Sequence, residues 1–404
     1  MTQPRRAAIV APIRSAVGKF GGGLAPLGAG QLAAGILSAL VARSGVDPAR
    51  VDEVVFAQSY GNAEAPCIGR WAWLAAGLPE HVPGYQLDRR CGSGLQAVVN
   101  AAMLVQSGAA DVVVAGGCES MSNVEHYSTD IRHGQRLGSV TLHDRLTRGR
   151  LMSQPVERYG VISGMIETAE NLARDWAISR EAADAYAARS HQRAAAAWAE
   201  GRFAEELVPL EVPARRGETV TFDRDEGYRA DATAESLAQL KPLEGGVVTA
   251  GSASQQNDGA AACLVVAEDK LADLRLEPIA YLHSWAAAGC DPARMGIGPV
   301  PATERLFARN GLGWGDVGLI ELNEAFAPQV LACLKAWGWA DDDGRHALLN
   351  VNGSGISLGH PIAATGGRIL ATLLHEMRRR DVRYGLETMC IGGGQGIAAL
   401  FEKA

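Results

Sequence analysis

Residues 91–117, CGSGLQAVVNAAMLVQSGAADVVVAGG, combine the two kinds of element from which the chain is built. The small residues of 95–106 predict a helix, and the apolar run 111–115, followed by Gly116 and Gly117, predicts a buried strand. The same alternation surrounds them, with strands predicted at 7–12, 51–58 and 82–88 and a helix at 30–43. Strands that alternate with helices predict an α/β fold with a largely buried sheet.

The order of these elements recurs near the other end of the chain. Helix–strand pairs are predicted at 302–310 with 317–322 and at 366–379 with 386–391. Val54 and Ile320 are separated by nearly the same offset as Cys91 and Gly359. We interpret this as an ancient duplication, with generic α/β alternation as the alternative.

The middle of the chain differs from both halves. Residues 122–248 hold many charges, and the alanine-rich segment 180–200 predicts a strong helix. A strand predicted at 261–267 returns to the first half, so we interpret 122–248 as an insertion. The predicted domains are therefore a first half of 1–121 with 249–270, an inserted loop domain of 122–248, and a second half of 271–404.

Composition excludes several classes of protein. The 404 residues are 47% hydrophobic and 21% charged, which is typical of a globular chain and not of a disordered one. The net charge of −7 does not favour a nucleic acid or an anionic membrane as partner. No apolar run reaches the roughly 18 residues of a membrane span, so we expect none.

The seven cysteines are odd in number and form no CxxC pair. We therefore expect neither a disulfide framework nor a metal site. The N-terminus has no signal-type apolar core, and the last residues, FEKA, are not a peroxisomal address. These features predict a protein of the reducing cytoplasm.

Cys91 is the first candidate for chemistry. It lies where a predicted strand ends and a helix begins, and the positive helix N-terminus should favour its thiolate. Gly92 and Gly94 leave room for a thioester to approach the backbone. Taken alone, the cysteine could equally be a small buried apolar residue.

Three further candidates follow glycine-rich or strand-end segments. His360 closes NVNGSGISLGHP, 350–361, and the following proline restricts its backbone. Cys390 opens the turn CIGGGQG, whose bare backbone N–H groups suit an oxyanion. Asn323 lies in ELNEAF, where it could cap a helix or hold a water molecule. Each residue alone has a purely structural interpretation.

Together these four segments resemble the thiolases, the acetyl-CoA acyltransferases. The resemblance extends from AIVAPIRSAVGKFGGGL at 8–24 to CIGGGQGIAALFE at 390–402. Between them, VVVAGGCESMS, TAENLA, GRF, TAGSASQQNDGAA, NEAF and GHP occur in the family's order. The resemblance implies a thiolase fold: two duplicated five-layered α-β-α-β-α halves, with a loop domain inserted in the first.

The resemblance also implies catalytic roles. Cys91 matches the nucleophile that takes the acyl group, and His360 matches the base that draws the proton from that thiol. Cys390 matches the acid/base that acts on the α-carbon of acetyl-CoA. Asn323 matches the residue holding a water that forms one oxyanion hole with His360, and the N–H groups of Cys91 and Gly392 match the second hole. The implied reaction is ping-pong through an acyl-cysteine.

The resemblance further implies substrate-binding residues and the substrates themselves. Those expected around coenzyme A are Arg229, Ser236 and Ser254, and those expected at the acyl end are Met165, Met295 and Phe326. Acetyl-CoA, acyl-CoA or 3-ketoacyl-CoA, and coenzyme A are the implied partners, with no separate cofactor. Many short-chain members have histidine where this chain has Gly164 and glycine where it has Ile166. These departures leave the acyl chain length open.

Acetyl-CoA C-acetyltransferase is the function expected first. The alternatives are a 3-ketoacyl-CoA thiolase of β-oxidation acting on longer chains, a decarboxylating condensing enzyme, and a non-catalytic acyl-CoA-binding homologue. Cys390 disfavours the condensing enzyme, and the presence of all four catalytic residues disfavours the homologue. Family members form dimers that often pair through the inserted loop, so we expect a homo-oligomer, either a tetramer or a dimer. The basic stretch 132–150 falls where that loop would lie.

Overall fold

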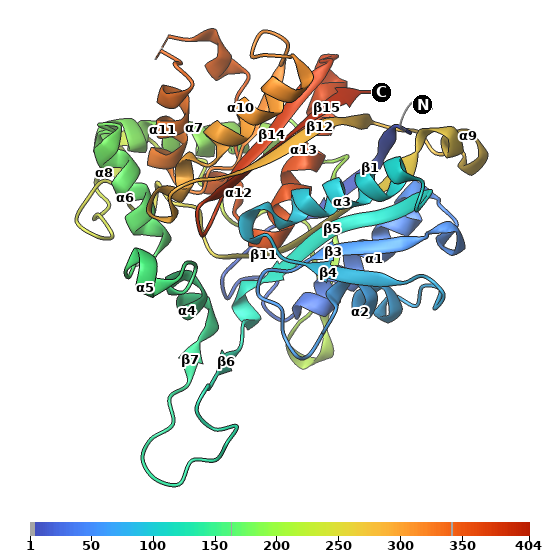
Figure 1. Ribbon diagram of the computed structural model, residues 1–404, viewed down its shortest axis with the longest axis horizontal. Helices are drawn as coiled ribbons and strands as arrows, with labels where there is room; N and C mark the ends of the chain where they lie inside the picture. The colour runs from blue at the N-terminus through green and yellow to red at the C-terminus, as the bar shows by residue number, and fades with distance from the viewer. Residues whose placement is uncertain (1–4, 163, 341) are drawn as a thin grey trace.

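A single large sheet organises the chain, whose computed structural model describes residues 5–162, 164–340 and 342–404 (Figure 1). Its eleven strands follow the order β13-β14-β15-β12-β1-β11-β5-β3-β4, with β2 beside β11 and β8 beside β1. The first half contributes β1 (Ala7–Ser15), β2 (Gly18–Lys19), β3 (Glu53–Ala57), β4 (Gly84–Leu87), β5 (Val112–Ser120) and β11 (Asn257–Ala267). The second half contributes β12 (Ala280–Gly289), β13 (Leu319–Leu322), β14 (Tyr384–Ile391) and β15 (Gln395–Lys403).

The two halves of the sheet have the same strand order and directions. Along β1-β11-β5-β3, the successive pairs are antiparallel, antiparallel and parallel. The pairs along β12-β15-β14-β13 repeat this pattern. The halves join where β1 meets β12 in a short antiparallel contact, Ala8 with Tyr281 and Ile9 with Ala280. The repeated order of elements in the sequence therefore corresponds to a repeated topology.

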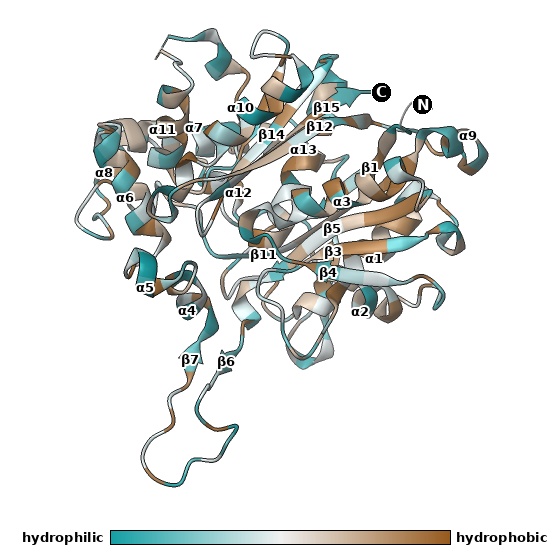
Figure 2. Cartoon of the chain, viewed as in Figure 1, coloured by the Kyte–Doolittle hydropathy of each residue, from teal (hydrophilic) through white to brown (hydrophobic). Residues whose placement is uncertain are grey.

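The two halves of the sheet and the helices that cover them form five layers. The helices of the central layer are α3 (Ser93–Ser107) and α13 (Thr365–Arg380), which pack against the inner faces of both halves. The outer helices are α1 (Ala29–Ser44) and α2 (Ile68–Ala75) on the first half and α10 (Pro299–Asn310) and α11 (Ala327–Ala336) on the second. Successive residues of the strands alternate between these cores, and Figure 2 shows β3 and β5 as largely apolar.

Glycines let the two central helices approach each other at their N-terminal ends. A Cβ atom on Gly366 would lie 2.1 Å from the backbone nitrogen of Leu95, and one on Gly94 would lie 2.7 Å from the carbonyl oxygen of Ala363. Side chains at these positions would force the helices apart. The close contact brings the segments that precede α3 and α13 together.

The inserted region is helical near the core and extended at its far end. Its helices are α4 (Arg145–Leu151), α5 (Val156–Tyr159), α6 (Met165–Asp175), α7 (Arg180–Ala199) and α8 (Ala234–Ala238). Its strands are β6 (His126–Tyr127), β7 (His143–Asp144), β8 (Leu207–Val208), β9 (Leu210–Pro213) and β10 (Thr219–Phe222). The predicted alanine-rich helix is confirmed as α7, which the Ser179 hydroxyl caps at the Ala182 N–H. Between β6 and β7 a long hairpin tip projects away from the body (Figure 1).

The remaining elements are short. They comprise α9 (Leu271–Leu274), α12 (Gly355–Leu358) and the 3₁₀ helices η1 (Pro48–Arg50), η2 (Arg90–Gly92), η3 (Met121–Asn123), η4 (Arg215–Gly217), η5 (Glu268–Lys270), η6 (Pro292–Ile297), η7 (Gly344–Ala347) and η8 (Ile362–Ala364). No helix in the described part of the chain is both long and apolar enough to cross a membrane.

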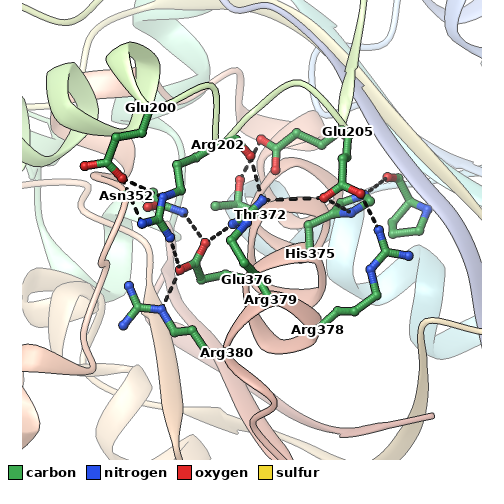
Figure 3. A network of polar contacts seen from close by, with 12 residues as sticks. Glu200, Arg202, Glu205, Asn352, Thr372, His375, Glu376, Arg378, Arg379 and Arg380 are labelled. Atoms are coloured by element: carbon green, nitrogen blue, oxygen red, sulfur yellow. Dashed lines mark hydrogen bonds and ion pairs between the residues drawn. The ribbon is translucent and has the colours of Figure 1, made fainter.

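A buried carboxylate ties the inserted region to the C-terminal end of α13 (Figure 3). Glu376 is 1% exposed, and Arg202 Nη1 and Asn352 Nδ2 donate to its two oxygens at 3.0 and 3.1 Å. Arg379 and Arg380 from the same helix also pair with it. Burial alone would raise the pKa of Glu376, but these hydrogen bonds and charges outweigh burial and lower it.

We expect Glu376→Gln to lower the free energy of unfolding at neutral pH by about 3–5 kcal/mol, because it leaves several guanidinium groups around an uncharged partner. The pKa of Glu376 is lowered in the folded protein, so its contribution is complete above the unfolded carboxyl pKa of about 4.3 and is lost as the pH falls through the lower folded value. Urea denaturation at neutral and acidic pH measures both effects.

The matched control is Glu205→Gln. Glu205 pairs with Arg378 at 2.6 Å, but both side chains are more than half exposed. Such a surface pair should contribute only about 0–1 kcal/mol. Equal losses in the two variants, or a Glu376 effect that persists in acid, would contradict the assignment.

Candidate active site

One cavity of about 690 Å³ lies between the two halves and the inserted region. Seven residues predicted as site residues line it: Cys91, Met165, Ser254, Met295, Phe326, His360 and Gly392. Segments that are far apart in the sequence therefore meet at one place. The other four predicted residues, Cys390, Asn323, Arg229 and Ser236, lie outside its lining.

Cys91 lies in η2, directly before α3. Arg90 precedes it in the left-handed region at φ 50°, which is a strained conformation for arginine, and Asp88 Oδ1 accepts from its N–H at 2.6 Å. The pKa of the Cys91 thiol is raised: loss of solvent raises it more than the Gly392 N–H and the Arg90 charge lower it. The expectation that the helix N-terminus leaves this thiol acidic is therefore wrong, because burial dominates. A neutral thiol needs a base to become nucleophilic.

His360 also lies at the cavity wall. Its backbone N–H donates to Asn257 Oδ1 at 2.9 Å, and its Nδ1 lies 2.7 Å from Thr365 Oγ1 at the start of α13. Nε2 has no hydrogen-bond partner among the described residues. Burial and the positive charges of Arg368 and Arg150 lower the pKa of His360 to about 3. The imidazole is therefore neutral at physiological pH and can accept a proton.

Cys390 is the penultimate residue of β14 and is completely buried. It packs with three cavity-lining side chains, Met165, Met295 and Phe326. Burial, followed by the neighbouring thiols of Cys91, Cys333 and Cys290, raises its pKa well above the ordinary value. A thiol kept protonated beside the cavity can donate a proton.

Asn323 is buried directly after β13. Its backbone N–H donates to Thr388 O at 3.0 Å, but neither amide atom of its side chain has a partner in the described part of the chain. Buried amides are nearly always hydrogen-bonded. A Cβ on Gly355 would lie 2.7 Å from Asn323 Oδ1, so a glycine there leaves room for this side chain. An unsatisfied amide is the feature expected of a residue that holds a water molecule.

Glu324 is a buried residue to which sequence reasoning gave no role. Its carboxylate accepts from Tyr186 Oη at 2.9 Å and Ser190 Oγ at 2.6 Å on α7, and from Asn350 Nδ2 at 3.0 Å and Ile356 N at 3.2 Å. It therefore ties the Asn323 segment to the inserted region and to the glycine-rich turn before His360. The sequence did carry one signal for this residue: Glu324 is a charged residue between a predicted strand and the apolar pair Ala325–Phe326.

Glu119 is a second such residue. It is fully buried in β5 and accepts from the backbone N–H groups of Ser59, Tyr60 and Ala363 at 3.1–3.3 Å. Burial raises its pKa to about 7 against these hydrogen bonds. It fixes two loops beside Cys91 and His360. The sequence signal for this residue was a single acidic residue in an otherwise apolar strand. The backbone N–H groups that bond to it lie far away in the sequence.

Arg229 and Ser236 lie on the exposed surface. The Arg229 N–H donates to His191 Nδ1 at 3.2 Å, and the Ser236 hydroxyl is engaged with Thr233 at the N-terminus of α8. Both departures from the family pattern, Gly164 and Ile166, do line the cavity. A Cβ on Gly164 would meet no atom within 4 Å, so the space beside it is open.

Comparison with known proteins gives consistent findings. Residues 7–269 match the family described as Thiolase, N-terminal domain, and residues 276–403 match Thiolase, C-terminal domain. The chain is 46% identical over 399 residues, 98% of each chain, to an acetyl-CoA acetyltransferase of Pseudomonas aeruginosa. It superposes on the crystal structure of the Bacillus anthracis acetyl-CoA acetyltransferase with a TM-score of 0.94, 41% identity and complete coverage of both chains. It also superposes on the crystal structure of human mitochondrial 3-ketoacyl-CoA thiolase with a TM-score of 0.92 and 38% identity, with 99% of each chain covered.

Proposed function

This chain belongs to the thiolase family, and on that premise we propose that it is an acetyl-CoA C-acetyltransferase. It would join two acetyl-CoA molecules into acetoacetyl-CoA and coenzyme A, and would catalyse the reverse thiolysis. The observation that supports this most is one cavity lined by Cys91, His360 and Gly392. The Bacillus anthracis acetyltransferase is also slightly more identical to this chain than the human 3-ketoacyl-CoA thiolase, 41% against 38%.

In the first half-reaction, Cys91 would take the acetyl group. Neutral His360 accepts the proton from the thiol as the sulfur attacks the thioester carbonyl, and the imidazole returns that proton to the sulfur of the leaving coenzyme A. Because the pKa of His360 is lowered to about 3, its imidazole is unprotonated at neutral pH and free to take the thiol proton. The N–H groups of Cys91 and Gly392 would stabilise the oxyanion.

In the second half-reaction, Cys390 would act as its thiolate and remove a proton from the methyl group of a second acetyl-CoA; its raised pKa makes that thiolate a strong base. The resulting carbanion attacks the acetyl group on Cys91, and a C–C bond forms as the C–S bond breaks. The proton held by Cys390 then passes to the released Cys91 sulfur. Asn323 would hold a water that, with His360, stabilises the enolate oxygen, and its unsatisfied side-chain amide supports that role. Each step uses protein groups and coenzyme A thioesters, and the proposal includes no further cofactor.

The substrate would lie along the cavity. Ser254 would face the pantetheine, and Met165, Met295 and Phe326 would surround the acetyl group, since all four line the cavity. Arg229 and Ser236 would bind the nucleotide end at the surface, where their exposure leaves them accessible. We place the protein in the cytoplasm, because all seven cysteines are free and free thiols persist in a reducing compartment.

The decisive experiment is thiolysis of acetoacetyl-CoA by the purified protein. Loss of acetoacetyl-CoA should depend on added coenzyme A and should yield two acetyl-CoA. Incubation with acetyl-CoA alone should add one acetyl group to the peptide that contains Cys91, as measured by mass spectrometry. Absence of both results would refute the proposed function.

We propose further that the protein is a tetramer built from two dimers that pair through the hairpin tip, residues 128–142. The tip exposes apolar side chains, among them Leu137 at 90% and Leu142 at 65%. Light scattering should give a tetramer for the full chain and a dimer after shortening of the tip, with folding otherwise intact. A monomer at micromolar concentration would contradict both levels of assembly.

A further inference from the structure

Arg150 projects from the last turn of α4 into the cavity that contains Cys91 and His360. Its charge lies close enough to His360 to contribute to the low pKa of that residue. Its side-chain partners are neutral. The charge of Arg150 acts on the Tyr60 hydroxyl. The Gln256 amide oxygen, in the orientation that satisfies both ends of that amide, accepts from Arg150 Nη1 and Nη2 at 3.1 and 3.2 Å.

The cavity is positively charged and its cations are unpaired. Three cationic residues line it, Lys19, Arg90 and Arg150, against one acidic residue, the exposed Glu244. Over the described ranges none of the three cations forms an ion pair; Arg90 instead donates to Gly149 O at 3.0 Å. Guanidinium groups in enclosed sites are normally paired with a carboxylate or phosphate. The unpaired guanidinium of Arg150 therefore favours an anion supplied by the ligand.

The phosphates of coenzyme A are poorly placed to be that anion. Its pantetheine arm contains two amide units and, when extended, separates the sulfur from the first phosphate by roughly 15 Å, as about four extended residues would. A thioester that reacts with Cys91 has its sulfur at the catalytic end of the cavity, where the charge of Arg150 acts on His360. The phosphates would then lie at the distant end of the arm. This arrangement favours the acyl part of the substrate as the group that reaches Arg150.

We propose, resting on the thiolase activity above, that Arg150 binds a carboxylate at the end of the acyl chain. The enzyme would then accept, in addition to acetyl groups, acyl-CoA and 3-oxoacyl-CoA substrates derived from dicarboxylic acids. A planar guanidinium binds a carboxylate through two parallel hydrogen bonds. Tyr60, Thr147 and Gln256 supply further polar groups to the cavity lining.

The chemistry of such a substrate balances as in ordinary thiolysis. Cys91 sulfur attacks the 3-oxo carbon, the C2–C3 bond breaks, and its electron pair takes a proton to give acetyl-CoA. Coenzyme A then takes the dicarboxylic acyl group from Cys91, and its thiol proton restores the protonation of the enzyme. The terminal carboxylate stays ionised throughout and takes no part in bond making.

The first test compares two 3-oxoacyl-CoA substrates with the same number of carbons. 3-Oxoadipyl-CoA ends in a carboxylate, and 3-oxohexanoyl-CoA ends in a methyl group. We expect wild-type kcat/KM for thiolysis to favour 3-oxoadipyl-CoA, and Arg150→Leu to reduce that preference by about 10- to 100-fold, as for loss of a hydrogen-bonded charge pair. Arg150→Lys should restore it in part, since it keeps the charge without the paired donors.

Arg148→Leu is the matched control. Arg148 lies on the same helix but outside the cavity lining, with its guanidinium 5.8 Å from the centre of the Tyr127 ring. It should leave the preference between the two substrates unchanged. Thermal unfolding of all three variants checks that each is folded.

Binding separates this inference from the proposed activity. Calorimetry with adipyl-CoA and hexanoyl-CoA needs no turnover, so a preference for adipyl-CoA that Arg150→Leu abolishes supports the inference even in a protein that cleaves nothing. Equal affinities in the wild-type protein would overturn it. So would an Arg150→Leu variant that weakens adipyl-CoA, hexanoyl-CoA and free coenzyme A alike, because that result assigns Arg150 to coenzyme A.

Discussion

Replacement of Cys91 by serine should reduce the thiolysis of acetoacetyl-CoA by roughly 10⁴-fold or more, the scale seen when a nucleophile is removed from an enzyme with a covalent intermediate. A serine hydroxyl is far less acidic than a thiol, and burial already raises the pKa of the thiol at this position. His360 cannot generate enough alkoxide to compensate. Steady-state kinetics and mass spectrometry after incubation with acetyl-CoA measure the two consequences, lost turnover and lost acetylation.

The chain provides a matched control in Cys67→Ser. Cys67 is an exposed free thiol outside the cavity lining, and its sulfur donates to Gly84 O at 3.3 Å, which a hydroxyl can also do. This variant should keep turnover and acetylation. If Cys91→Ser still became acetylated on another cysteine and turned over normally, Cys91 would not be the nucleophile.

Replacement of Cys390 by alanine should separate the two half-reactions. Acetylation of Cys91 should continue, because it requires only Cys91, His360 and an oxyanion hole. Condensation should fall by about 10²–10⁴-fold, the usual contribution of a general acid or base. Because Cys390 is completely buried and its pKa is well above the ordinary value, no solvent group can replace it easily.

Exchange of solvent deuterium into the methyl group of acetyl-CoA reports on Cys390 directly. The exchange should stop in Cys390→Ala while the acetyl adduct on Cys91 still forms. Cys333→Ala is the control, since Cys333 is another buried thiol near Cys390 and lies outside the cavity lining. Lost acetylation with retained exchange would reverse the roles of the two cysteines.

Much of the fold could be predicted from local patterns. The helix expected at 95–106 is α3, Ser93–Ser107, and the strand expected at 111–115 is the start of β5, Val112–Ser120. The strand expected at 82–88 is shorter, as β4, Gly84–Leu87. Strand ends were missed where glycine or polar residues continue a buried strand, as in the GGCES end of β5, because the hydrogen bonds of a central strand override local propensity.

The site was only partly predictable for a different reason. Cys91, His360 and Gly392 have local glycine-rich signatures, and the structure brings them to one cavity. The roles of Arg150 and Glu119 cannot be read from their local sequence, because they depend on groups such as Tyr60 and Ala363 that come from other elements. The acidity of Cys91 was misjudged for the same reason: sequence shows the helix start but not the depth of burial.

The central position of β1 imposes an order on the synthesis of this chain. β1 is the first strand to leave the ribosome, yet its neighbours β11 and β12 begin at Asn257 and Ala280. Until they emerge, β1 can pair only with the two residues of β8, so most of both its edges stays unpaired. Closing so long a loop makes its pairing slow. An exposed edge strand invites pairing with other chains. The nascent first half therefore passes through a long period in which it depends on protection from aggregation before Cys91 can meet His360.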